Sequence, residues 1–181
     1  RRLSTKDSIV LAAMGKLLNK KLGSLLKFGD HVIGTDKFEH FLGSGFRYFK
    51  NHYLEGKSID KVLTSGMNTE FGSMGAKTTG VISYADLSAN FNGMRFWNAV
   101  LATGVDPLGE EFNHGPYVLC DKNKWIRVMD FDWLNYIDST FDESVNCSDY
   151  RTLKIKLKIE KNLQATKEDL LCLFQQNPAL K

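Results

Sequence analysis

Proline, long apolar runs and linker-like segments are scarce in this sequence. Its 181 residues include three prolines, no internal repeat and no low-complexity tract, which predicts one domain over residues 1–181. No segment approaches the ~18–20 consecutive apolar residues of a transmembrane helix, so we expect no membrane span. With 43% hydrophobic and 12% aromatic residues, the chain has the apolar side chains to build a core.

Several chemical signatures are also missing. A net charge of +3 lacks the dense basic patch of a nucleic-acid-binding protein, so we expect no nucleic-acid partner. The four histidines show no HExxH spacing and the chain has no CxxC, so we predict no metal site and no cofactor. No GxSxG elbow supports a Ser/His/Asp hydrolase. Gly43-Ser44-Gly45 lies inside a helical pattern, which argues against a phosphate-binding loop.

Cysteine is rare but informative. Cys120 and Cys147 flank a compact aromatic-rich unit and can pair, while Cys172 sits in an apolar run typical of a core residue. One disulfide fits an exported protein, and three free thiols in a cytosolic protein are the alternative. The chain begins Arg-Arg without Met, as it would after loss of a signal peptide. We therefore expect a secreted or periplasmic location.

Hydrophobic periodicity predicts an α+β fold that is mainly helical. A helical core is expected over residues 4–103, followed by a hairpin and helix elaboration over residues 104–181. Leucine and isoleucine alternate with lysine over 153–159, which favours a strand and leaves a helix as the alternative. The predicted elements are helices over 4–28, 36–54, 59–71 and 84–103, hairpins over 76–83 and 117–129, a short helix from 132 and a final helix from 166.

Glu70 occupies an unusual position for a carboxylate. Ile59, Leu63, Met67 and Glu70 are spaced 4, 4 and 3, which places them on one stripe of a helix. A carboxylate on an apolar stripe is disfavoured unless it is paired, hydrogen-bonded or protonated. An apolar pocket that keeps it protonated makes Glu70 a candidate general acid. The alternative is a helix-end glutamate bonded to hairpin amides or to His40.

Further polar residues can share this site. Asp36 and His40 are four apart and face the same side of a helix. His40 is either a proton relay or an interior histidine bonded to Asp36 or Glu70. Asp86 is either a second catalytic group or the N3 member of a capping box that Ser83 begins.

Hydroxyl and aromatic side chains can hold a substrate. Tyr84 and the hydroxyl residues of the 76–83 hairpin can position a sugar or a water, or need no function at all. Aromatic residues such as Trp97 can stack on sugar rings, and core packing is the alternative. The catalytic candidates are Glu70, Ser83, Tyr84 and Asp86; the substrate-binding candidates are Thr78, Thr79, His40, Asn90 and Trp97.

A helix that ends in Glu70, followed by a small hairpin and a long helix, resembles the core of the lysozyme superfamily. The resemblance covers residues 58–103 and implies a lysozyme-like helical domain. It also implies hydrolysis of the β-1,4 bond between N-acetylmuramic acid and N-acetylglucosamine in bacterial peptidoglycan, with Glu70 as the acid. The chain departs from the family because no aspartate follows Glu70 by about ten residues. The implied partner is the peptidoglycan glycan strand, cleaved by a monomer.

A second resemblance rests on a string of residues. The string reads Asp36-Lys37-x-x-His40-Phe41, then Glu70, then Ser83-x-x-Asp86-Leu87-x-x-Asn90-x-x-Gly93. It is similar to that of VanZ-like and YfiM-like envelope proteins, and it implies an envelope location and a shared polar cluster while leaving activity open. Two hypotheses follow: a peptidoglycan-cleaving hydrolase, and a non-catalytic envelope binding or accessory protein.

Overall fold

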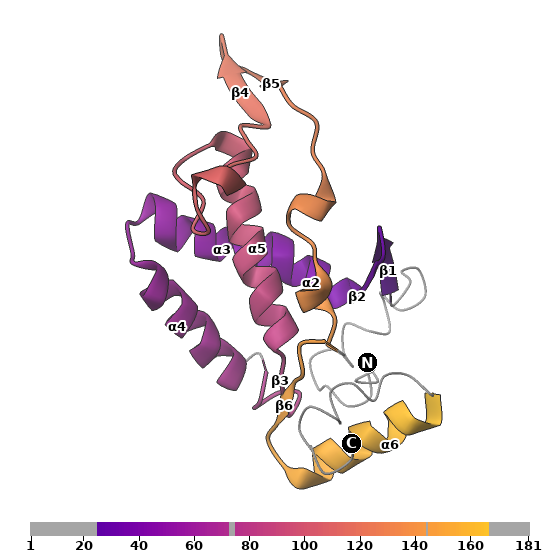
Figure 1. Cartoon of the computed structure of the whole chain (residues 1–181). Helices are drawn as coiled ribbons and strands as arrows, with labels where there is room; N and C mark the ends of the chain where they lie inside the picture. The colour runs from indigo at the N-terminus through magenta and orange to yellow at the C-terminus, as the bar shows by residue number, and fades with distance from the viewer. Residues whose placement is uncertain (1–24, 73–74, 144, 167–181) are drawn as a thin grey trace.

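The computed structural model describes residues 25–72, 75–143 and 145–166 (Figure 1). It is a mainly helical α+β fold with three two-stranded antiparallel sheets, which confirms the predicted fold class. No helix in these ranges is long and apolar enough to cross a membrane. The helix predicted from residue 166, most of the helix predicted over 4–28, and the core position of Cys172 lie outside the described residues.

The first described element is a hairpin, so the helix predicted to extend to residue 28 is wrong at its end. Strand β1 (Leu25–Phe28) pairs with β2 (His31–Gly34). Gly29 has a φ of 54°, a left-handed conformation that glycine adopts without strain and that lets the chain reverse. Ile33 of β2 is 1% exposed and packs into the main core. Pairing of β1 with the partly buried strand β2 outweighs the helical pattern of residues 25–28.

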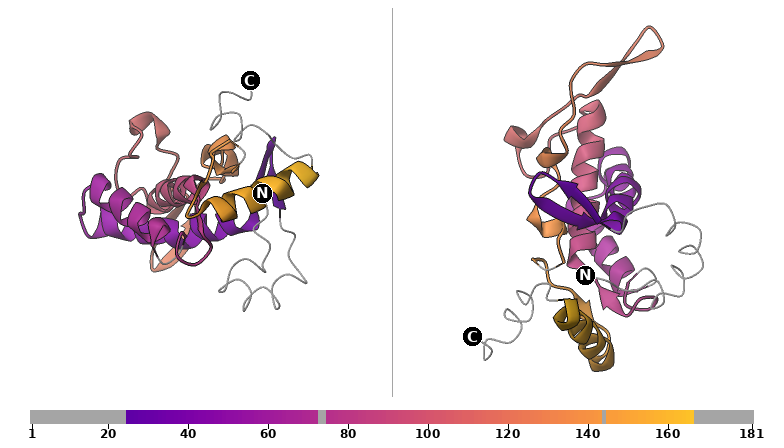
Figure 2. Two further views of the ribbon diagram at one scale, coloured as in Figure 1. Left: turned by 90° about the horizontal axis from the view of Figure 1, so that it is seen from below. Right: turned by 90° about the vertical axis from the view of Figure 1, so that its right-hand side faces the viewer.

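The predicted helix over 36–54 is confirmed as one continuous helical run. It contains four segments in sequence: α2 (Thr35–Glu39), the π-helical η1 (His40–Ser44), α3 (Gly45–Phe49) and the π-helical η2 (Lys50–Leu54). It crosses α5 (Tyr84–Leu101), the long helix at the centre of the molecule (Figure 1, Figure 2). A Cβ on Gly45 would lie 2.6 Å from the Cα of Gly93, and one on Gly93 would overlap the Phe41 carbonyl. The two backbones therefore touch.

Helix α4 (Ile59–Phe71) is confirmed, but the hairpin predicted over 76–83 is not formed. The amides of Thr78 and Thr79 both donate to the Gly75 carbonyl and close a turn there. Strand β3 (Val81–Ile82) pairs instead with β6 (Asp149–Tyr150). The partner strand thus comes from the C-terminal part of the chain.

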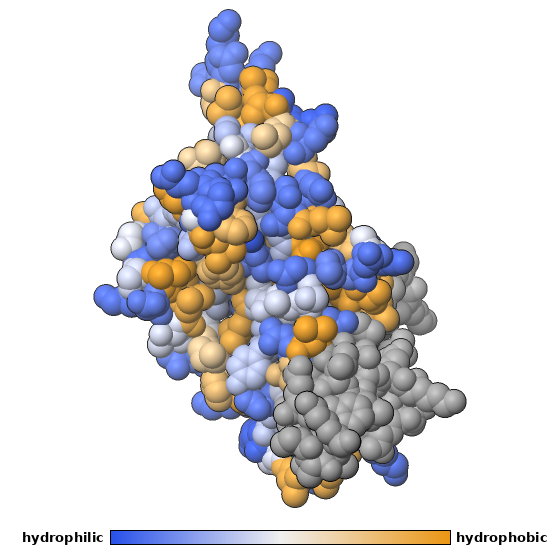
Figure 3. Space-filling model, viewed as in Figure 1, coloured by the Kyte–Doolittle hydropathy of each residue, from blue (hydrophilic) through white to orange (hydrophobic). Residues whose placement is uncertain are grey.

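A second hairpin protrudes from one end of the molecule, as predicted for residues 117–129. Strands β4 (Val118–Asp121) and β5 (Lys124–Arg127) meet at a turn in which Lys122 and Asn123 have φ values of 46° and 61°. Apolar side chains show on its surface below a hydrophilic tip (Figure 3). Three 3₁₀ turns lie before and after it: η3 (Glu110–Phe112), η4 (Trp133–Asn135) and η5 (Ser139–Phe141).

The strand predicted over 153–159 is wrong, because this segment belongs to helix α6 (Leu153–Thr166). A helix brings Ile155 and Ile159, four residues apart, to one side. Ile159 is 9% exposed, whereas Leu153 and Leu157 are 69% and 54% exposed. Ile159 is therefore buried and Ile155 half-buried, so burial in this segment follows the helical period.

The C-terminal part contributes to the same core as the helices. Tyr136, Ile137 and Phe141 are each 1% exposed and belong to one cluster with Ile33 and Phe41. A smaller cluster joins α3 to α4 and α5; its buried members are Tyr48, Phe49, Val62 and Met94. The segment around η4 and η5 therefore covers the crossing helices.

Cys120 and Cys147, which the sequence leaves free to pair with each other, are not joined. Cys147 takes part in a disulfide, whereas Cys120 is a free and exposed thiol. Cys120 belongs to β4, and Cys147 precedes β6 by two residues. These strands lie at opposite ends of α5 (Figure 1). The sequence pattern around the two cysteines gave no measure of that separation.

The contact between the two crossing helices can be tested at glycine. We expect Gly93→Ala to lower the free energy of unfolding by about 2 kcal/mol or more, because its methyl group overlaps a backbone carbonyl that cannot rotate away. Urea denaturation measures the change. Gly43→Ala is the matched control, since a Cβ there meets nothing within 4 Å and alanine favours a helix. Equal stability of both variants would contradict the close approach.

Candidate functional site

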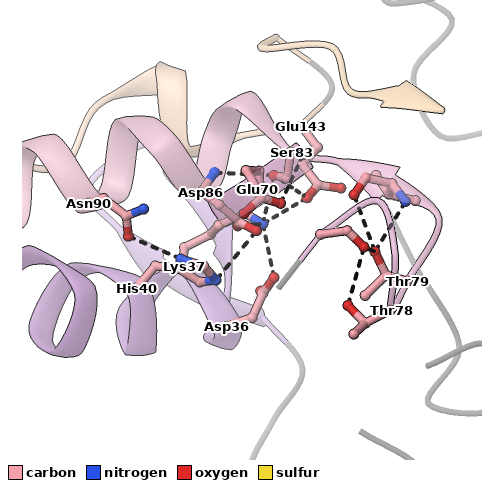
Figure 4. Close-up of polar contacts among 12 residues, drawn as sticks. Asp36, Lys37, His40, Glu70, Thr78, Thr79, Ser83, Asp86, Asn90 and Glu143 are labelled. Atoms are coloured by element: carbon pink, nitrogen blue, oxygen red, sulfur yellow. Dashed lines mark hydrogen bonds and ion pairs between the residues drawn. The ribbon is translucent and has the colours of Figure 1, made fainter. Parts of the chain in front are cut away.

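The ammonium of Lys37 lies at the centre of a buried polar cluster (Figure 4). Lys37 is 2% exposed. Its Nζ donates to an Asp86 carboxylate oxygen, to Glu143 Oε1 at 2.7 Å, to Asp36 Oδ2 at 2.9 Å and to Ser83 Oγ at 3.3 Å. We call the residues joined here, together with Glu70, His40 and Asn90, the Lys37 network.

Attraction between the ammonium and the carboxylates keeps this cluster ionised. Burial alone would lower the pKa of Lys37, but the carboxylates of Asp86, Glu143 and Asp36 raise it well above its usual value. Burial would raise the pKa of Glu143, and the Lys37 charge lowers it instead. The side chain of Asp36 is more than half exposed, and the Lys37 charge lowers its pKa as well. The ammonium and its partners therefore stabilise one another's charged forms.

Ser83 is the N-cap of α5 and holds the first turn of that helix, which contains Asp86, within the network. Its Oγ accepts the Asp86 amide at 3.1 Å, which confirms the predicted N-cap. The Asp86 carboxylate does not complete the capping box, because it turns to Lys37. The Ser83 amide donates instead to Glu70 Oε1 at 3.3 Å. One serine thus joins the ends of two helices.

Glu70 lies on the buried side of α4, as expected. The buried residues of that helix are Val62, Gly66 and Glu70, so the apolar stripe runs one residue earlier than predicted. Glu70 is 4% exposed. A Cβ on Gly75 would lie 2.5 Å from Glu70 Oε1, so the chain's own backbone closes over the carboxyl. Burial raises the pKa of Glu70, and the nearby Asp86 charge raises it further.

His40 joins the network through partners that the sequence did not indicate. Its Nδ1 lies 3.0 Å from Asn90 Oδ1, and its Nε2 lies 3.4 Å from Asp86 Oδ2. Asp36 and Glu70, the expected partners, are not the groups that it contacts. Beyond Asn90 lies Tyr48, whose hydroxyl is buried and makes no hydrogen bond to any described residue. Burial raises the pKa of Tyr48.

The two threonines form the turn after Glu70. Thr78 Oγ1 and Thr79 Oγ1 both donate to the Gly75 carbonyl, at 3.2 and 2.9 Å. Thr79 Oγ1 also accepts the Val81 amide at 3.1 Å. Both side chains lie beside the network (Figure 4), and their hydroxyls satisfy backbone groups there.

The side chains of Tyr84 and Trp97 make their hydrogen bonds outside the Lys37 network. The Tyr84 hydroxyl donates to Asp149 Oδ2 at 2.6 Å and so joins α5 to strand β6. Trp97 Nε1 donates to the Leu42 carbonyl at 2.9 Å, and its ring packs on Phe46 with centroids 5.2 Å apart. Trp97 therefore fixes the crossing of the helices and does not approach Glu70.

Sequence reasoning missed Lys37 and Glu143. Lys37, Phe41, Gly45 and Tyr48 are spaced 4, 4 and 3 and are all buried, so the argument that singled out Glu70 applies equally to Lys37. Glu143 gives no such signal. It reaches Lys37 from 106 positions away, in a segment without regular periodicity.

The carboxylates offer a cation site that the protein fills itself. Oxygens of Asp36, Asp86 and Glu143 lie within 4.8 Å of one another, a spacing compatible with a metal ion. The Lys37 ammonium bonds to all three and supplies the positive charge. The arrangement is therefore complete as an ion network.

A surface hollow in the described part of the chain lies outside this network. It is open and sits along one side of α4. Its lining residues are Asp60, Lys61, Thr64, Ser65, Asn68 and Thr69. Glu70 is absent from that lining, so this hollow does not present the carboxyl to a glycan.

No protein-family model, curated protein or solved structure matches this chain. A function must therefore be argued from the geometry of its own side chains. The most informative fact is that the polar residues of the string at 36–90 all belong to one cluster.

Removal of the central ammonium tests the network. We expect Lys37→Met to lower the free energy of unfolding at pH 7 by about 3–5 kcal/mol, because it leaves the buried Asp86 and the partly buried Glu143 without their counter-charge. Chemical denaturation followed by circular dichroism measures the loss. Lys61→Met, at an exposed lysine of α4, is the matched control and should change stability by less than about 0.5 kcal/mol. Equal effects would show that the network contributes nothing.

The pH dependence should follow Glu143. Its pKa is lowered from the usual 4.5, so its contribution is present above that value and is lost as pH falls through the folded-state pKa. We expect Glu143→Gln to be less stable than the wild type at pH 7 and to approach it near pH 3. Unfolding curves at both values measure the difference. Glu39→Gln, at an exposed position, should show no such convergence.

Proposed function

We propose that this chain is a non-catalytic binding or accessory protein of the cell envelope, in which the Lys37 network is structural. The observation that carries the proposal is the burial of Lys37 among three carboxylates from separate segments. Asp36 precedes it in α2, Asp86 lies in the first turn of α5, and Glu143 follows η5. A fully paired ammonium cannot act as a general base, and it ties these segments together.

The resemblance to VanZ-like and YfiM-like envelope proteins supports this proposal. The polar residues of the resembling string lie together, although they come from three helices. Its apolar members are also placed: Phe41 is 0% exposed, and Gly93 meets the Phe41 carbonyl. The polar members of the string all lie in the Lys37 network, which supports a role in fixing how α2, α4 and α5 pack.

A lysozyme-type hydrolase is the second candidate, and one observation favours it. The raised pKa of Glu70 extends its protonated form toward neutral pH, as a general acid requires. Against it, Glu70 is 4% exposed and is bonded to the Ser83 amide, whereas a general acid must come within about 3 Å of the glycosidic oxygen. The hairpin expected beside Glu70 is also absent.

We propose peptidoglycan glycan strands as the ligand and a secreted or periplasmic location. The mildly basic pI of about 8.7 suits an anionic wall polymer. The disulfide at Cys147 suits an oxidising compartment.

Purified sacculi test the proposal. We expect the wild-type chain to co-sediment with sacculi and to release no muropeptides, and Glu70→Gln to behave in the same way. Release by the wild type that Glu70→Gln abolishes would establish the hydrolase instead. Absence of both binding and release would rule out peptidoglycan as the ligand.

The stability of Glu70 variants controls this experiment. Glu70→Gln retains an oxygen that can accept the Ser83 amide, so it should fold normally. The pKa of Glu70 is raised from 4.5, so its stabilising contribution is present at low pH and is lost as pH rises through the folded-state pKa. Glu70→Gln should therefore gain stability relative to the wild type as pH rises above about 4.5. Glu70→Ala removes the acceptor and should cost about 1–3 kcal/mol.

A further inference from the structure

One end of the molecule exposes an unusual number of apolar side chains. Half of the large hydrophobic residues exposed in the described part fall between residues 101 and 129. On the segment before the protruding hairpin, Val105 and Leu108 are 53% and 50% exposed, and on the hairpin Trp125 is 68% exposed. We call this surface, formed by residues 101–129, the apolar end. Contiguous exposed apolar surface of this kind marks an interaction site.

The hairpin within the apolar end is uncovered on both faces. Leu119 pairs with Ile126 on one face, and Cys120 pairs with Trp125 on the other. All four are exposed. The hairpin stands away from the helices (Figure 1, Figure 2), and apolar atoms form a band below its tip (Figure 3). A two-stranded hairpin has little stability alone in water, so its apolar faces are best explained by a partner that covers them.

The charges of the apolar end identify the kind of partner. At the hairpin tip Lys122 and Lys124 outnumber Asp121, which leaves the tip with a net positive charge, and the exposed Glu110 and Glu111 make the neighbouring η3 turn acidic. Arg127 is already paired with Asp130 at 3.1 Å. A surface with both signs side by side complements itself when two copies meet about a two-fold axis. The acidic groups would repel an anionic lipid surface.

We propose that the apolar end binds a second copy of this chain. In this two-fold dimer, the hairpin of each copy lies against residues 105–112 of the other. The lysines of each hairpin then face Glu110 and Glu111 of its mate. Trp125 is the central contact, since tryptophan is among the residues that contribute most to protein interfaces. The inference does not depend on whether Glu70 is catalytic.

A charge exchange tests the proposed dimer. We expect analytical ultracentrifugation of the wild type over a concentration series to show a monomer–dimer equilibrium. Lys122→Glu with Lys124→Glu, or Glu110→Lys with Glu111→Lys, should each raise the dissociation constant about tenfold or more. All four substitutions together should restore it, because the signs are exchanged but still complementary. Asp60→Lys with Lys61→Glu, on α4, is the matched control.

A monomer at every concentration, or failure of the four substitutions to restore association, would overturn the proposal. Binding to anionic phospholipid vesicles without self-association would overturn it in favour of a lipid surface. Cys120 gives an independent measurement, since it is a free thiol beside Trp125 on the hairpin. Its modification by a maleimide, followed by peptide mass spectrometry, should slow as the dimer forms. A dimer with an unchanged rate would place the interface elsewhere.

Discussion

The burial of a single ammonium group determines how the helices of this protein meet. Lys37 is 2% exposed, and a lone charge in such a place would be too costly for the fold to tolerate. Its charge is acceptable only because Asp36, Asp86 and Glu143 reach it together. Each of these carboxylates belongs to a different part of the chain. The need to pair this ammonium with carboxylates therefore fixes the position of α2, of the start of α5 and of the segment after η5.

The same constraint explains Glu70. Ser83 contributes its Oγ to Lys37 and to the Asp86 amide, while its own amide is bonded to Glu70. Glu70 therefore lies close to Asp86, whose charge adds to burial in raising its pKa. A raised pKa is typical of a catalytic acid, but here the packing of an ion network is sufficient to produce it. Access to solvent, not acidity, is what separates the two interpretations of this residue.

The sequence predicted those features that depend on local periodicity. The helices that contain Phe41, Val62 and Ala89 were found because their apolar residues repeat with the helical period. Strand β3 was assigned the wrong partner, since β6 lies about 70 positions further along the chain. The pairing of Lys37 with Glu143 is equally remote. Lys37 shows the same local pattern as Glu70, a charged residue on an apolar stripe of a helix, so the argument made for Glu70 also predicts that Lys37 is buried.

Helix α5 separates two surfaces of different character. Asp86, in the first turn of α5, belongs to the Lys37 network, where polar groups are paired within the chain. Beyond its last turn lies the apolar end, where Trp125 and its neighbours have no covering side chains among the described residues. Exposed apolar surface is costly in water and is retained where a partner removes it. The groups of the Lys37 network bond to one another within the fold, whereas the apolar end is the part of the described molecule whose exposed surface calls for a partner.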